Sequence, residues 1–391
     1  MLALLWLVYA SFGLISQSMS PLVSLVLKDL NMSYSQMGLI LGSWQLTYIL
    51  AALVAGSIID LWGIRRSLLA GTVIIALSAA LRFFPNGFGA MLLVVALFGV
   101  GGPMISIGAP KTISLWFSGR GRGTAVGVYL TGYRVGGFLA LALTNSFFMP
   151  LTGHSWRLTF VCYGFVAFSV SILWWLLAKD SAIGVGSERT RLRETFSRLM
   201  KVRNAQVVLA IAFLSFATYH GFTSWLPKIL ETTGLTATAA GYSASIPLVT
   251  GIPGLLVIPR LVPPHQRGRL IAVFAFLTIV TLLVVVRGSG ALLFAGLTLF
   301  GITSSSFVPI LMLMLMDAPE IGSKYMGAAG GLFFCVAEIG GFAGPLIMGF
   351  FVDIAGTFLA GASFLASLNI AILALTFLLK TQSSHQEKLP G

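Results

Sequence analysis

The sequence predicts an all-α integral membrane protein in which twelve transmembrane helices form two pseudo-symmetric six-helix bundles. Hydrophobic residues make up 57% of the 391-residue chain and charged residues only 9%, whereas about a quarter of the residues of a typical soluble domain are charged. The apolar runs exceed the roughly 20 residues that cross a bilayer, and a glycine-rich pattern occurs twice. We therefore expect most of the surface to face lipid, which leaves no free face for nucleic acid.

Twelve apolar runs define the predicted spans. They cover residues 3–27, 35–59, 67–84, 88–116, 124–149, 157–178, 205–227, 239–260, 268–287, 290–316, 325–352 and 356–379. The first run lacks the basic start and small-residue cleavage site of a signal peptide, so we expect it to remain as the first helix. The predicted domains are an N-terminal bundle (1–178), a cytoplasmic linker (179–204), a C-terminal bundle (205–380) and a cytoplasmic tail (381–391).

The distribution of basic residues predicts the orientation. With the N-terminus in the cytoplasm, the cytoplasmic loops and tail carry seventeen of the Lys and Arg residues and the opposite loops carry five. This bias follows the positive-inside rule, so both termini are predicted to be cytoplasmic in a cell-membrane protein. The net charge of +13 is therefore a signal of topology.

The linker is the longest polar stretch of the chain. It reads "KDSAIGVGSERTRLRETFSRLMKVRN", and the apolar residues Leu192, Phe196 and Leu199 recur at helical spacing. This pattern predicts an interfacial amphipathic helix from about Glu188 to Val202, with a regulatory or partner-binding role as the alternative. Cys162 and Cys335 fall inside spans, so we expect packing residues and no disulfide.

The two halves repeat each other at an offset of 204 residues. This offset aligns "GTAVGVYLTGYRVGGFLAL" (123–141) with "GAAGGLFFCVAEIGGFAGP" (327–345), and it also places Arg65 on Arg269. The same offset therefore aligns two separate parts of the chain, which indicates two similar six-helix halves. In that register the intramembrane Arg134 lies opposite Glu338.

The loop after the second span resembles a signature of the major facilitator superfamily. The residues that match are Gly56, Asp60, Gly63, Arg65 and Arg66, in "GSIIDLWGIRR". Leu61 departs from the pattern, because the family often has a basic residue there. Among the branches of the superfamily, the chain looks most similar to cyanate-permease-like and monocarboxylate-like anion carriers.

The resemblance implies a secondary transporter whose two bundles rock about a central site. The signature would form a latch at the cytoplasmic end, in which Asp60 accepts hydrogen bonds from the amides of a neighbouring helix and Arg65 and Arg66 complete a salt-bridged contact. The alternative is that these arginines only anchor the loop on the cytoplasmic side.

The resemblance implies that the first, fourth, seventh and tenth spans line a central cavity and that the second, fifth, eighth and eleventh spans flank it, so polar and aromatic residues of these spans define the candidate site. Ionisable groups among them stand out, because such groups are costly inside a membrane and commonly functional. The candidate substrate-binding residues are Arg134, Gln17, Tyr48, Tyr219, His220, Trp225 and Ser305. The guanidinium of Arg134 can donate two parallel hydrogen bonds to a carboxylate or another oxyanion of the substrate. The alternative is a structural or gating contact with backbone carbonyls or with a carboxylate of the protein. Glu338 is the leading candidate for proton coupling and His220 the second, whereas Lys111 is expected to extend its amine to the cytoplasmic interface.

No enzyme or channel signature competes with this interpretation. The four histidines have no metal-ligand spacing, and neither a phosphate-binding loop nor a filter is visible. We therefore expect no metal and no cofactor. The sequence predicts a monomeric, proton-coupled transporter of a small organic or inorganic anion. The alternatives are a proton-coupled exporter of amphipathic or cationic drugs and a transport-inactive membrane sensor.

Overall fold

The computed structural model describes residues 1–179, 202–317 and 322–379. In this part of the chain every regular element is helical, and twelve helices are long and apolar enough to cross a membrane. This confirms the predicted fold class and the number of spans. The predicted interfacial helix before Val202 and the tail after residue 380 lie outside the described residues.

The N-terminal half supplies the first six spans. Its helices are α1 (Leu2–Gln17), α2 (Val23–Asp29), α3 (Tyr34–Trp62), α4 (Ile64–Leu81), α5 (Phe88–Trp116), α6 (Gly119–Leu143), α7 (Met149–Leu151) and α8 (Trp156–Leu177), with a 3-10 turn at Ser20–Leu22 and a π-helical turn at Thr144–Phe148. The first span is therefore not one continuous helix. It breaks after Gln17 and resumes at Val23, because Pro21 lacks the amide that would continue the helical ladder.

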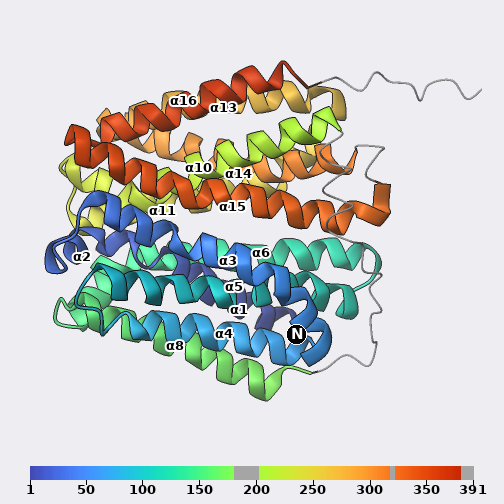
Figure 1. Cartoon of the computed structure of the whole chain (residues 1–391), viewed down its shortest axis with the longest axis horizontal. Helices are drawn as coiled ribbons and strands as arrows, with labels where there is room; N and C mark the ends of the chain where they lie inside the picture. The colour runs from blue at the N-terminus through green and yellow to red at the C-terminus, as the bar shows by residue number, and fades with distance from the viewer. Residues whose placement is uncertain (180–201, 318–321, 380–391) are drawn as a thin grey trace, which may run out of the picture.

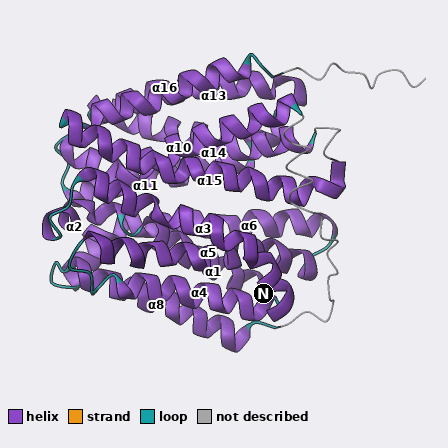
Figure 2. Ribbon diagram, in the orientation of Figure 1, coloured by secondary structure: helices purple, strands orange, loops and turns teal. Residues whose placement is uncertain are grey.

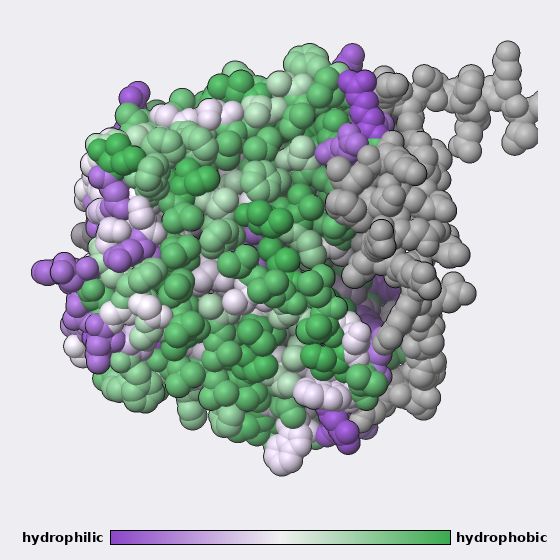
Figure 3. Space-filling view, in the orientation of Figure 1, coloured by the Kyte–Doolittle hydropathy of each residue, from purple (hydrophilic) through white to green (hydrophobic). Residues whose placement is uncertain are grey.

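The C-terminal half supplies the other six spans. Its helices are α10 (Arg203–Thr232), α11 (Ala237–Leu256), α12 (Ile258–Leu261), α13 (Arg267–Arg287), α14 (Gly290–Met316), α15 (Gly322–Ala355) and α16 (Phe358–Thr376), with a 3-10 turn at Pro264–Gln266. Figure 1 shows the two halves as adjacent bundles, and Figure 2 shows the same helices by type. Figure 3 shows an apolar belt between two more polar ends, as expected for a protein surrounded by lipid.

We name the two ends by the predicted orientation. The cytoplasmic end carries Met1 and Asp60, and the external end carries Asp29 and Asp353. Two helix pairs, α3 with α15 and α6 with α11, form most of the interface between the bundles. The candidate site therefore lies between elements that belong to different halves.

The bundles are in close contact at the external end. A Cβ placed on Gly349 of α15 would lie 2.2 Å from the carbonyl oxygen of Tyr34 on α3, and one on Gly241 of α11 would lie 2.4 Å from that of Leu141 on α6. Glycine lets the backbones approach to this distance. Toward the cytoplasmic end, neither Gly56 on α3 nor Gly331 on α15 has a neighbour within 4 Å of a Cβ placed there. The bundles are thus in backbone contact at the external end and less closely packed toward the cytoplasmic end, where a Cβ on Gly127 of α6 would still lie 4.0 Å from Leu256 of α11.

Candidate functional site

A cavity of about 590 Å³ lies between the bundles. Its polar lining includes Tyr9, Tyr48, Ser106, Tyr129, Tyr133, Arg134, Ser215, Tyr219, His220, Ser304, Ser305 and Glu338, and its apolar lining includes Phe12, Trp44, Phe216, Phe307 and Phe334. These side chains come from α1, α3, α5 and α6 of the N-terminal half and from α10, α14 and α15 of the C-terminal half. The cavity is large enough for a small organic solute.

Arg134 faces this cavity from α6, and its Nη1 atom is buried without a hydrogen-bond partner. Ser305 on α14 has a buried Oγ that is also without a partner. Gly251 on α11 makes room for both: a Cβ there would lie 2.7 Å from Nη1 of Arg134 and 2.2 Å from Oγ of Ser305. The site therefore holds a guanidinium and a hydroxyl that are close together and lack protein acceptors.

Glu338 faces the same cavity from α15. Its Oε2 atom is buried without a hydrogen-bond partner, as are both amide atoms of Gln45 on α3. A Cβ on Gly341 would lie 2.9 Å from Oε2 of Glu338, 3.2 Å from Cδ2 of His220 and 3.4 Å from Cγ of Gln45. The missing side chain at position 341 thus lets a carboxyl, an imidazole and an amide from three helices come together.

No ion pair joins Arg134 to Glu338 or to another carboxylate within the described ranges. Arg134 and Glu338, which the internal repeat aligns with each other, both line the cavity and face it from different bundles. Because a buried charge without a partner is costly, the cavity is suited to a ligand that supplies acceptors to Arg134.

Tyrosines and other aromatic residues form much of the cavity wall. The hydroxyl of Tyr48 lies 2.7 Å from Oγ of Ser106, and the hydroxyl of Tyr133 lies 3.3 Å from Oγ of Ser16. Tyr133 directly precedes Arg134 and was not among the predicted substrate-binding residues. The signal available was its position beside an intramembrane charge on a glycine-rich helix.

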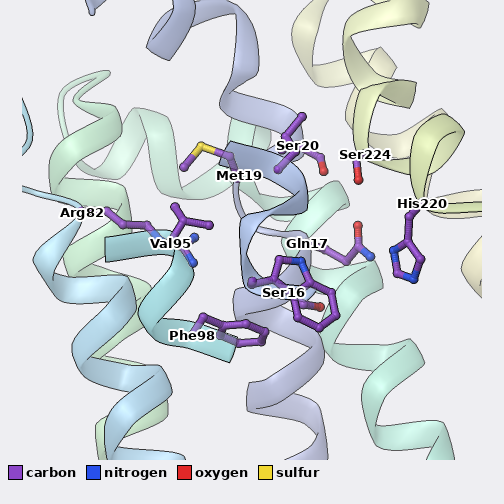
Figure 4. Close-up of a pocket in the computed structure, with 11 residues that line it drawn as sticks. Ser16, Gln17, Met19, Ser20, Arg82, Val95, Phe98, His220 and Ser224 are labelled. Atoms are coloured by element: carbon purple, nitrogen blue, oxygen red, sulfur yellow. The ribbon is translucent and has the colours of Figure 1, made fainter. Parts of the chain in front are cut away.

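Two predicted substrate-binding residues lie outside the cavity lining. Trp225 is fully buried, and its indole Nε1 donates to the carbonyl of Pro345 at 3.0 Å. In this structure its side chain packs against α15 rather than facing the cavity. Gln17 lines a smaller pocket beside the central one, together with His220 (Figure 4). Tyr48, Tyr219, His220, Ser305 and Arg134 all line the central cavity.

In this structure the predicted latch residues Asp60 and Arg65 contact residues of their own bundle. Asp60 at the end of α3 forms an ion pair with Lys111 of α5, in the same bundle, and not a contact with the amides of a neighbouring helix. Arg65 donates from Nη2 to the carbonyl of Trp175 at 2.6 Å. Lys111 was expected to extend its amine to the cytoplasmic interface, and the amine reaches the Asp60 carboxylate at the cytoplasmic end. Gly63 has a φ of +81°, which explains why glycine occupies the turn between α3 and α4.

The C-terminal half has a corresponding ion pair with the charges exchanged. Arg267 at the start of α13 pairs with Asp317 at the end of α14, so the base comes first in the sequence and the acid second. In the pair of the N-terminal half the acid, Asp60, comes first and the base, Lys111, second. Each pair joins the second or third span of its half to the fourth at the cytoplasmic end. Both pairs therefore stabilise a bundle internally.

Comparison with known proteins identifies the family. Residues 5–345 match the sequence model of the Major Facilitator Superfamily. Since this match covers most of the chain, the protein belongs to the Major Facilitator Superfamily and is a membrane transporter rather than an enzyme.

The chain is also similar to individual transporters. The chain is 26% identical over 365 residues to the hexuronate transporter of Bacillus subtilis (strain 168), which covers 88% of this chain and 85% of that protein. It is 22% identical over 405 residues to the probable galactarate/D-glucarate transporter GudP of Escherichia coli (strain K12), covering 90% and 86%. The crystal structure of a mutant form of the nucleoside transporter NupG superposes with a TM-score of 0.82 at 15% identity, covering 96% and 99%, and this likeness supports the fold.

Proposed function

We propose that this protein transports a small organic anion of the sugar-acid type across the cell membrane by alternating access, coupled to protons. The observation that carries the proposal is the buried Nη1 of Arg134, which faces the central cavity without a protein acceptor. A carboxylate is the ligand group that best matches a guanidinium, because it accepts two parallel hydrogen bonds.

The rest of the cavity suits a hydroxylated carbon chain. Ser304, Ser305, Tyr48 and Tyr219 add hydroxyls to the lining of the cavity that Arg134 faces, and such groups form hydrogen bonds with hydroxyls of a solute. The hexuronate and galactarate/D-glucarate transporters to which the chain is similar are named for polyhydroxylated acids. The proposal thus rests on the charge and polarity of the lining together with these relatives.

Glu338 is the proposed proton carrier. It is 8% exposed, lies in the bundle opposite Arg134 and has an unpartnered Oε2. Protonation would remove the cost of its buried charge, whereas a nearby substrate anion would oppose its ionisation. Binding of the anion and of the proton would therefore favour each other, which is the requirement for symport.

Alternating access is supported by where the bundles touch. The close approaches of α3 to α15 and of α6 to α11 lie at the external end, while Gly56 of α3 and Gly331 of α15, toward the cytoplasmic end, have open space beside them. Rocking of the bundles about the cavity would exchange these conditions. Because both bundles that line the cavity belong to one chain, we also expect a monomer to carry out transport.

The test is uptake by the purified protein in liposomes with an acidic exterior. We expect accumulation of D-glucuronate or D-glucarate and no accumulation of uncharged D-glucose, whose size and hydroxyls are similar. Collapse of the pH gradient should abolish accumulation but permit exchange. Transport of D-glucose at the rate of D-glucuronate would refute the assignment of an anion.

A drug exporter is the second candidate, since the unpartnered carboxyl of Glu338 and the aromatic walls also suit an amphipathic cation. The same liposomes therefore include a cationic dye. Its transport without transport of D-glucuronate would support the exporter instead.

A further inference from the structure

The external end of the N-terminal bundle contains a second arginine that the site above does not use. Arg82 follows α4 at the external end, near the external limit of the predicted span 67–84. In the structure its side chain is only 2% exposed. It lines a small pocket formed by both bundles, with Ser16, Gln17 and Ser20 from the first span and His220 and Ser224 from α10 (Figure 4).

The contacts of Arg82 do not compensate its charge. Its Nη1 donates to Oγ of Ser18 at 3.0 Å, and its guanidinium carbon lies 5.2 Å from the ring centre of Phe160. Its Nε has no hydrogen-bond partner, and no carboxylate in the described part of the chain forms an ion pair with it. Other arginines differ: Arg157, at the same end, pairs with Asp29, and the buried Arg267 pairs with Asp317.

The small pocket and the central cavity share one wall. Trp44 of α3 and His220 of α10 line both, and their rings meet edge to face with centres 6.0 Å apart. One ring belongs to each bundle. Separation of the bundles at the external end would therefore part the rings and connect the two spaces.

The pocket has room for little more than a water molecule in this externally closed structure, since its volume is about 20 Å³. Separation of α10 from the first span would enlarge it, because His220 and Ser224 form one side and Ser16, Gln17 and Ser20 the other. A guanidinium would then face a widened polar opening on the external side of Trp44.

We propose that Arg82 forms a second carboxylate-binding site, which holds the transported anion on the external side of the Trp44–His220 wall before the anion reaches Arg134. This inference rests on the proposed function, since it assigns to the same anion a position occupied when the external end is open. Arg82 is buried without a carboxylate partner because its partner is the substrate.

The first test compares the two faces of the membrane. D-glucuronate transport is measured in right-side-out and inside-out vesicles for the wild type, Arg82→Lys and Arg157→Lys, the last being a control at the same end. Arg82→Lys keeps the charge but loses the fork, so we expect the KM at the external face to rise about tenfold. The KM at the cytoplasmic face should stay within about twofold, because Arg134 is intact. Arg157→Lys should change neither value.

Equal KM values for Arg82→Lys and wild type at the external face would overturn the inference. No transport of D-glucuronate by the wild type would instead refute the proposed function. Chloride is the other anion of matching chemistry, so external chloride is varied against sulfate. Activation of the wild type by chloride, lost in Arg82→Lys, would show that the site takes an inorganic anion and would overturn the assignment to substrate.

A second measurement leaves Arg82 in place in case its variant does not fold. Ser20→Cys is introduced after both native cysteines are replaced, and a membrane-impermeant thiol reagent is added from the external side. We expect D-glucuronate to slow the modification and D-glucose to leave it unchanged, because the bound anion would cover the pocket. Equal rates with D-glucuronate and D-glucose would contradict the inference.

Discussion

The external end of the interface is held by a carboxylate that caps a helix of the other bundle. Asp353 of α15 accepts hydrogen bonds from the backbone amides of Tyr34 at 2.9 Å and of Ser35 at 2.7 Å, the first two residues of α3, and also from the Ser35 hydroxyl. A negative charge at this position also interacts favourably with the helix dipole. These contacts exist only while the external end is closed, so they favour the closed state.

We predict that Asp353→Asn shifts the protein toward the externally open state. The variant keeps one carbonyl acceptor but loses the charge and one of the two acceptor oxygens. A hydrogen bond to a charged group contributes about 1.5–3 kcal/mol and an exposed charge at a helix N-terminus about 0.3–1 kcal/mol. Since Asp353 is exposed to solvent, we expect a net loss of about 1–2 kcal/mol, which changes the ratio of open to closed molecules by about 5- to 30-fold.

The measurement is a spin-label distance across each end. Labels at Phe84 and Leu292, which are 68% and 60% exposed, report the external end, and labels at Leu61 and Leu261, which are 79% and 73% exposed, report the cytoplasmic end. We expect the external distance to lengthen and the cytoplasmic distance to shorten in Asp353→Asn.

Asp29→Asn is the matched control for this variant. Asp29 is also an external carboxylate, but its partner, Arg157, belongs to the same bundle. Its loss should therefore leave both distance distributions unchanged. If Asp353→Asn also leaves them unchanged, the contact with α3 does not bias the closed state and the reasoning is wrong.

The other predictions concern the cavity and the cytoplasmic ion pair. Arg134→Lys should weaken D-glucuronate binding by about 1.5–3 kcal/mol. If the ligand-free melting point falls while the ligand-dependent shift in melting point is unchanged, Arg134 is structural. Glu338→Gln should abolish uptake driven by a pH gradient yet retain exchange of D-glucuronate; retained accumulation would move the proton to His220. Asp60→Asn should cost about 1 kcal/mol or less of stability, since its pair with Lys111 is partly exposed. The double variant Asp60→Asn/Lys111→Met should be more stable than Asp60→Asn alone, because it leaves no unpaired amine. Equal thermal unfolding of these two variants would argue against a stabilising pair.

The sequence by itself determined the class of fold, because lipid imposes constraints that are local. A span needs a long apolar run whose backbone groups bond within one helix, and these runs are visible without tertiary information. The repeat at an offset of 204 residues indicated two similar halves, and Arg134 and Glu338 stood out because charges inside spans are rare. The loop signature at Gly56 to Arg66 indicated the superfamily.

Only the tertiary structure decided which side chains meet. The resemblance to the superfamily implied that the spans of Trp225 and Gln17 line the cavity. The direction of each side chain depends on the rotation of its helix against its neighbours, so one lies in the packed core and the other in a separate pocket. The pairing of Asp60 with Lys111 joins residues 51 positions apart, and no local pattern specifies such a partner. In the sequence Arg82 is an ordinary cation near the external limit of a predicted span. Its burial in the N-terminal bundle follows from the break in the first span, where Ser18 accepts its hydrogen bond, and from the position of Phe160 on α8, which are long-range properties of the fold.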